Sequence, residues 1–181
     1  VASALVEFET THVAWEVVRL RLESAAVVSP TTLENTLSSA TKKALRKATL
    51  NVVPCVSLVV ESFSSLSSQL EALAACPACQ SNGAKLTSVI VCCNSAYLHS
   101  PRHSLPPGFM EQLHKGLVDN VVLSGPHDTP GMADLLQLRL PGVTLVRSAR
   151  GQLIRGLDAL LSTERQFHAA ITGCTRLWPS H

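Results

Sequence analysis

Five apolar runs divide this chain at fairly regular intervals, and stretches with helical spacing of apolar residues separate them. The runs are Ala4–Phe8, Leu50–Val60, Leu86–Cys93, Val118–Leu123 and Val143–Val146. Strands that alternate with helices are typical of a parallel sheet with crossover helices. We therefore predict a three-layer, Rossmann-like α/β fold with a mainly parallel sheet. In such a fold, a ligand site lies at the carboxyl ends of the strands.

Residues 1–28 are predicted to form an N-terminal β segment ahead of an α/β domain of residues 29–181. The segment would supply edge strands to the sheet or belong to a neighbouring domain. Its second part, Val13–Leu22, fits a strand, although the spacing of its apolar residues leaves a short helix as an alternative. Ser29-Pro30 marks the start of the first helix of the domain, because serine suits the N-cap and proline the first helical position.

Three later segments carry specific expectations. The run Leu50–Val60 is almost continuously apolar, which predicts a strand buried on both faces. Pro54 cannot donate to a ladder, so it should mark a bulge, an edge or the start of this strand. Helices are expected over Ser62–Ala75 and Gln152–Leu161, where leucines recur at helical spacing.

Charge and length exclude several classes of protein. The 181 residues suffice for one domain with room for a small appendage, and the formal net charge of +2 argues against a dedicated nucleic-acid or membrane-surface binder. No run reaches the roughly 18 apolar residues that a membrane span needs. Charged residues make up only 15%, which indicates either a surface rich in serine and threonine or faces covered by other parts of a larger protein. The chain opens without methionine, and we expect it to be a piece of a longer polypeptide.

The six cysteines include the motif Cys76-x-x-Cys79. Such a pair forms half of a structural zinc site, and His99 and His103 could complete four ligands. A redox role is disfavoured, because the pair follows a predicted helix C-terminus, where a thiolate is not stabilised. Packed or exposed reduced thiols in a cytosolic protein are the main expectation, with the zinc site as the alternative.

Polar residues follow the predicted strands, but no familiar catalytic signature appears among them. The chain has no G-x-S-x-G elbow, and the loop of residues 124–131 lacks the glycine motifs that bind nucleotide phosphates. Turn and capping chemistry explains this loop without a ligand. A ligand site in this region would nevertheless collect residues from three successive strand ends: Asn94, Ser95, Ser124, Gly125, His127, Asp128 and Arg147.

The segment CPACQSNGAKLTSVIVCCNSAYLHSPRH, followed by GFMEQLHKGLVDNVVLSG, resembles the C-terminal region of Shulin-type axonemal dynein assembly factors. The resemblance covers most of the chain and rests on the overall sequence of this segment. It implies a large cytoplasmic, non-enzymatic protein that packages outer-arm dynein for cilia and is linked to an Arf-like small GTPase. It supplies no catalytic residues.

The sequence therefore favours a non-catalytic protein-interaction domain of a cytoplasmic scaffold or assembly factor. Its partners would be proteins, with dynein subunits and an Arf-like small GTPase as candidates; no cofactor, nucleic acid or membrane is expected. The alternative is a divergent Rossmann-like enzyme or small-molecule binder that uses the strand-end residues.

Overall fold

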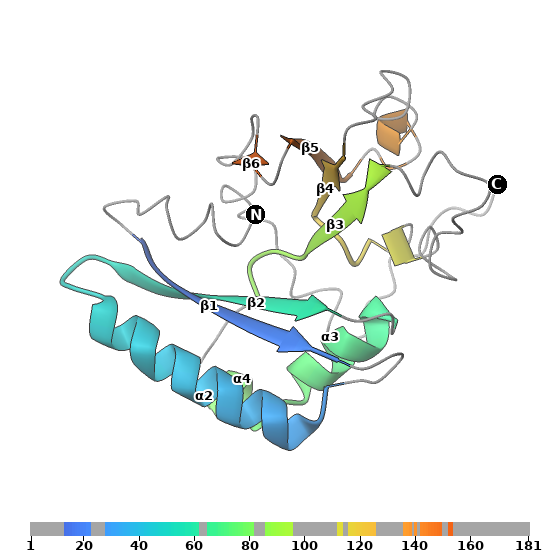
Figure 1. Cartoon of the computed structure of the whole chain (residues 1–181). Helices are drawn as coiled ribbons and strands as arrows, with labels where there is room; N and C mark the ends of the chain where they lie inside the picture. The colour runs from blue at the N-terminus through green and yellow to red at the C-terminus, as the bar shows by residue number, and fades with distance from the viewer. Residues whose placement is uncertain are drawn as a thin grey trace. The chain divides into compact units, whose positions relative to one another are not determined.

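The structure is a computed structural model that describes residues 13–22, 28–61, 65–81, 86–95, 112–113, 116–125, 136–138, 140, 142–149 and 152–153. The chain divides into two compact units, Val1–Lys85 and Leu86–His181, which we describe separately (Figure 1). The expected strand Ala4–Phe8 lies outside the described residues. The division into residues 1–28 and 29–181 stays a prediction.

The first unit is built around a β–α–β element. Strand β1 (Val13–Arg21) pairs in parallel with β2 (Val53–Glu61), and helix α2 (Pro30–Lys47) connects them. Helix α2 lies along one face of this two-stranded sheet (Figure 1). Helices α3 (Leu66–Ala74) and α4 (Pro77–Ser81) follow β2.

The start of α2 follows the predicted chemistry. Ser29 is the N-cap and Pro30 occupies the first turn, although the Ser29 side chain makes no capping hydrogen bond. The Ser29 carbonyl instead accepts the first helical bond from the Leu33 N–H at 2.9 Å. The apolar stripe of α2 is buried over four positions: Leu33, Leu37, Ala40 and Ala44.

The core of the first unit lies between α2, α4 and one face of the sheet. Its buried members are Val28, Leu33, Leu37, Cys76 and Ala78. Partly buried side chains from the sheet pack against them, including Leu20, Val56, Leu58 and Val60. The pairing registers Val18 with Leu58 and Leu20 with Val60, so alternate residues of both strands share the face toward α2.

The second unit contains a four-stranded sheet. Its strands are β3 (Ile90–Asn94), β4 (Asn120–Ser124), β5 (Thr144–Ala149) and β6 (Gln152–Leu153), in the order β3-β4-β5-β6. The first three strands are parallel, and β6 pairs antiparallel with β5. The central strand β4 is buried from Asn120 to Leu123, as expected for a strand with neighbours on both sides.

The predicted α/β class and parallel pairing are confirmed, and each of the four described apolar runs supplies a strand. The Val13–Leu22 stretch is a strand, so its helical alternative is wrong. The described strands form two sheets rather than the single sheet we expected. The prediction that Leu50–Val60 is buried on both faces is also wrong, because β2 has β1 as its only described neighbour and is half-buried or exposed throughout. That edge position accommodates Pro54.

One further prediction is wrong where the chain resumes after β5. Gln152 and Leu153 form strand β6, in register with Ala149 and Ser148, and do not begin a helix. The leucine spacing of this segment fits a helix, but pairing with β5 decides the conformation of its first two residues. The remainder of the predicted helix lies outside the described residues.

A buried carboxylate, that of Asp119, connects the segments at the amino end of the second sheet. Asp119 is buried, and its Oδ2 accepts a hydrogen bond from the Val89 N–H at 2.8 Å, while the Asp119 N–H donates to the Val89 carbonyl at 3.0 Å. The Asp119 carbonyl also accepts from Thr144 N–H at 2.9 Å. Asp119 thus joins the segments that precede β3 and β5.

Replacing Asp119 with alanine is expected to lower the free energy of unfolding by about 2 kcal/mol, because the buried Val89 N–H loses its acceptor. Urea denaturation followed by far-UV circular dichroism measures the loss. Asp119→Asn keeps one carbonyl oxygen and should lose less. An alanine variant as stable as the wild type would contradict this account.

Candidate functional site

The carboxyl edge of the second sheet gathers polar side chains. Asn94, Ser124 and Ser148 occupy one register row across β3, β4 and β5, so the three strands present them on the same face. Ser95 and Gly125 directly follow the ends of β3 and β4. We call these five residues the strand-end cluster.

Gly125 lets the two strand ends approach closely. A Cβ atom built on it would lie 2.7 Å from Asn94 Oδ1 and 2.8 Å from Ser95 Oγ, closer than real Cβ contacts. Its φ of +127° is also a backbone conformation that favours glycine. The glycine therefore brings the Asn94 amide and the Ser95 hydroxyl against the β4 backbone.

The hydroxyls of the cluster differ in their bonding. Ser124 Oγ donates to the Cys93 carbonyl at 3.4 Å. Ser95 is only 7% exposed, yet its Oγ has no hydrogen-bond partner among the described residues. A buried hydroxyl without a partner costs free energy, and a bound polar group would recover it.

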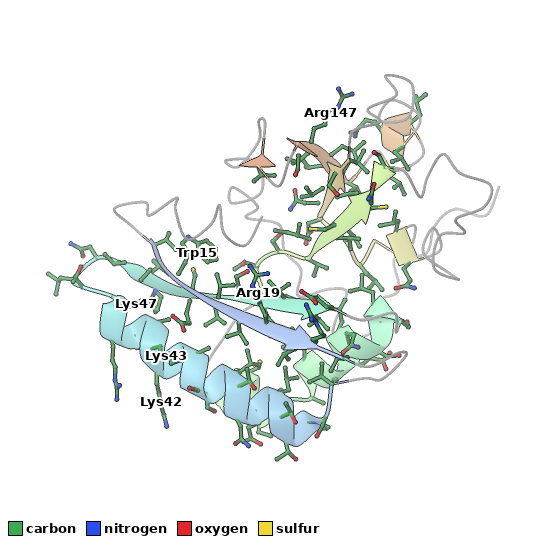
Figure 2. The ribbon with its side chains drawn as sticks, viewed as in Figure 1. Trp15, Arg19, Lys42, Lys43, Lys47 and Arg147 are labelled. Carbon is green, nitrogen blue, oxygen red and sulfur yellow. The ribbon has the colours of Figure 1, made fainter. Side chains whose placement is uncertain are left out.

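Only part of the predicted ligand site comes together. The structure joins Asn94, Ser95, Ser124 and Gly125 as expected from the shared edge of parallel strands. Arg147 is in register with Leu123, one residue away from the row of Ser124, so it belongs to the opposite face of the sheet and projects from β5 (Figure 2). His127 and Asp128 lie outside the described residues.

Sequence reasoning missed Ser148, which is buried at the end of β5. The signal that could have found it is alternation along the strand. Successive side chains of a strand point to opposite faces. Ser148, one residue after Arg147, is therefore the residue of β5 that shares a face with Ser124.

The cysteine pair packs in the core of the first unit. Cys76 is fully buried among Val28, Leu33 and Leu37, and the Cys79 N–H donates to the Cys76 carbonyl at 3.0 Å. Burial, followed by the neighbouring Cys76 thiol, raises the pKa of Cys79 to about 11. The protein around Cys79 therefore favours its neutral thiol, whereas a redox nucleophile is a thiolate.

The zinc site stays a prediction. His99 and His103 lie outside the described residues, and the part of the chain that the structure describes holds no group of three or more metal-ligating side chains. Cys55, Cys76, Cys79, Cys92 and Cys93 are free cysteines. On β3, Cys92 is exposed and Cys93 is buried, as expected for neighbours on opposite faces of a strand.

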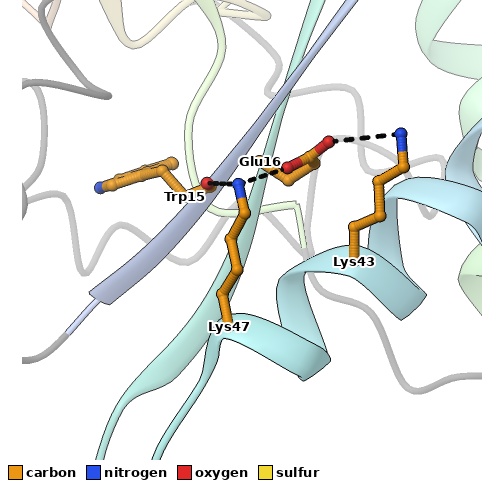
Figure 3. A network of polar contacts seen from close by, with 4 residues as sticks. All are labelled: Trp15, Glu16, Lys43 and Lys47. Atoms are coloured by element: carbon orange, nitrogen blue, oxygen red, sulfur yellow. Dashed lines mark hydrogen bonds and ion pairs between the residues drawn. The ribbon is translucent and has the colours of Figure 1, made fainter.

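A charged network ties α2 to β1 in the first unit. Lys47 Nζ donates to Glu16 Oε2 at 2.7 Å and to the Trp15 carbonyl at 3.4 Å, and Lys43 Nζ lies 3.8 Å from Glu16 Oε1 (Figure 3). The hydrogen bond from Lys47 holds the pKa of Glu16 below its ordinary value of 4.5. The network thus stabilises the ionised carboxylate and fixes the end of α2 on the strand.

Replacing Glu16 with glutamine should cost up to about 1 kcal/mol of unfolding free energy near neutral pH, since both lysines are largely exposed. The folded pKa of Glu16 is lower than the unfolded one, so this contribution is present above pH 4.5 and disappears as the pH falls through the folded value. Urea denaturation of both proteins near pH 7 and about pH 3 tests this prediction. A difference that persists unchanged in acid would contradict it.

The fold and the strand-end cluster define an α/β protein with parallel strands and a polar group of residues at their carboxyl edge. Residues 1–173 match the family model described as the DAAF9 domain. The chain belongs to this family, that of dynein axonemal assembly factor 9.

Two other comparisons gave no match. No curated protein matches the chain significantly. No solved structure matches it either. Within the part of the chain that the structure describes, no helix is both long and apolar enough to cross a membrane.

Proposed function

We propose that this chain is a non-catalytic protein-interaction domain of a larger cytoplasmic scaffold that assembles axonemal dynein. The family match over residues 1–173 carries the proposal. The low charge content supports it, because a domain within a large assembly needs fewer solvated side chains. The proposal further includes a Shulin-type role, dynein subunits as partners and a link to an Arf-like small GTPase.

A capture experiment tests the proposal directly. The 181-residue chain, tagged and immobilised, is incubated with purified outer-arm dynein and separately with an Arf-like small GTPase loaded with GDP or a GTP analogue. Saturable binding of dynein subunits supports the assembly role, and nucleotide-dependent capture of the GTPase supports the regulatory link. Binding of neither partner would overturn the proposal.

For the unit Leu86–His181 we also propose the Rossmann-like three-layer arrangement. Strands β3, β4 and β5 are parallel and follow one another in sequence order, and parallel strands require crossover connections. Right-handed crossovers between successive strands would place the connecting segments on one face of the sheet. The three-layer arrangement also requires chain segments on the second face of the sheet, and an experimental structure tests this part of the proposal.

The second candidate function is small-molecule binding at the strand ends. The observation that favours it is the buried, unpartnered Ser95 hydroxyl beside Gly125. Asn94 and Ser124 belong to the same proposed site, with His127 and Asp128 as further predicted members, whereas Arg147 lies on the opposite face of the sheet and is left out of it. A thermal-shift series with nucleotides and phosphorylated metabolites tests it. Stabilisation that is abolished by Ser95→Ala and retained by Ser39→Ala, at an exposed position of α2, would support the site, and no shift in the folded protein would exclude it.

A further inference from the structure

The outward surface at the end of α2 combines exposed leucines with positive charge. Because the buried residues Leu37, Ala40 and Ala44 mark the inner face, Lys42 and Arg46 lie on the opposite side of the helix and Leu45 lies beside them. Figure 2 shows Lys42 extending away from the sheet. Leu45 is 56% exposed, and Leu50, in the turn after the helix, is 92% exposed. We call Lys42, Leu45, Arg46 and Leu50 the α2-end patch.

The charge of this surface is one-sided. No Asp or Glu occurs between Glu34 and Glu61 in the sequence. The Glu16 carboxylate of β1 forms ion pairs with Lys43 and Lys47. Lys42 and Arg46 form no ion pair with any described residue. The helix dipole favours cations in the last turn, but it gives no reason for two leucines within residues 42–50, Leu45 and Leu50, to be exposed to water.

We propose that the α2-end patch binds an acidic segment of a protein partner that carries apolar side chains beside its carboxylates. The proposal names the partner chemistry of the interaction domain and rests on the proposed function. Carboxylates would meet Lys42 and Arg46, and apolar side chains would cover Leu45 and Leu50. Residues 42–50 contain no aromatic side chain, which favours a protein segment over an anionic membrane, where aromatic anchors are typical.

Fluorescence anisotropy with a labelled peptide of repeated Glu-Leu-Glu-Glu-Leu units measures this binding. Lys42→Gln/Arg46→Gln should weaken binding about 3- to 10-fold at low salt, because two surface charge contacts are lost. Leu45→Ser/Leu50→Ser should weaken it about tenfold, since two apolar side chains lose their cover. Matched peptides with Leu replaced by Ser, or Glu by Gln, should bind correspondingly less.

The matched control lies on the same helix. Thr31→Glu/Asn35→Glu changes the net charge by the same amount as the double glutamine variant, at exposed positions near the start of α2. Near wild-type affinity of this control supports the patch, and equal weakening would show that only overall charge matters. The proposal is overturned by equal weakening, by no saturable binding up to about 1 mM peptide, or by binding to phosphatidylserine vesicles alone.

Capture of outer-arm dynein separates this proposal from the proposed function. If the wild-type chain captures dynein and both patch variants capture it equally well, the patch is refuted and the assembly role stands. If the wild-type chain binds the acidic peptide but neither dynein nor the GTPase, the assembly role is refuted and the patch stands.

Discussion

Replacing Leu33 with alanine is expected to lower the free energy of unfolding of the first unit by about 3 kcal/mol. Leu33 is only 2% exposed and packs in the cluster with Val28, Leu37 and Cys76 between α2, α4 and the sheet. Truncation removes its apolar contacts and leaves a cavity in the core of the first unit.

Tryptophan fluorescence during urea denaturation measures this loss. Trp15 lies in β1, so a Trp178→Phe background makes the signal report on the first unit. Leu45→Ala is the matched control, because Leu45 belongs to the same helix but is more than half exposed. It should change stability by no more than about 0.5 kcal/mol. Equal losses for Leu33→Ala and Leu45→Ala would contradict the packing described here.

Local patterns predicted most elements that the structure describes. The apolar stripe with Ser29-Pro30 ahead of it defined α2, because its side chains repeat at the helical period and its first turn has suitable chemistry. Apolar runs predicted β2 to β5, since continuous apolar residues suit strands that pack inside an α/β protein. These patterns depend on neighbours in sequence, which the sequence displays directly.

The partition of the strands into two sheets could not be predicted in this way. Which strand pairs with which depends on contacts between distant segments, and β2 carries the same kind of apolar run as β3 and β4, although it pairs in a different sheet. The exposure of Leu50 likewise could not be predicted from its neighbours in sequence. It belongs to an apolar run, but Asn51 adopts a φ of 73° and β2 begins only at Val53, so the leucine lies in an exposed turn.

The candidate site was predictable to the extent that parallel strands share an edge. Asn94, Ser95, Ser124 and Gly125 come together for that reason. Arg147 does not join them, because its face depends on the register between β4 and β5, and a shift of one residue exchanges the faces of a strand.

Replacing Gly125 with alanine is expected to cost about 3 kcal/mol of unfolding free energy in the second unit. An alanine at a φ of +127° is strained, and its Cβ would lie 2.7 Å from Asn94 Oδ1 and 2.8 Å from Ser95 Oγ. The ends of β3 and β4 would have to separate. Native-state hydrogen exchange of the β4 amides measures the loss within this unit.

Alanine variants of two other glycines separate the cost of backbone strain from the cost of a close contact. Gly116 has a φ of +68° and no atom within 4 Å of an added Cβ, so Gly116→Ala should cost about 1 kcal/mol, whereas Gly142→Ala, with open space and an ordinary φ, should be nearly neutral. Removing the Ser95 hydroxyl should restore part of the Gly125→Ala loss, because the two atoms are in contact and their effects are coupled. A Gly125→Ala variant as stable as Gly142→Ala would show that the strand ends do not approach closely, and the strand-end cluster would then lose its basis as a binding site.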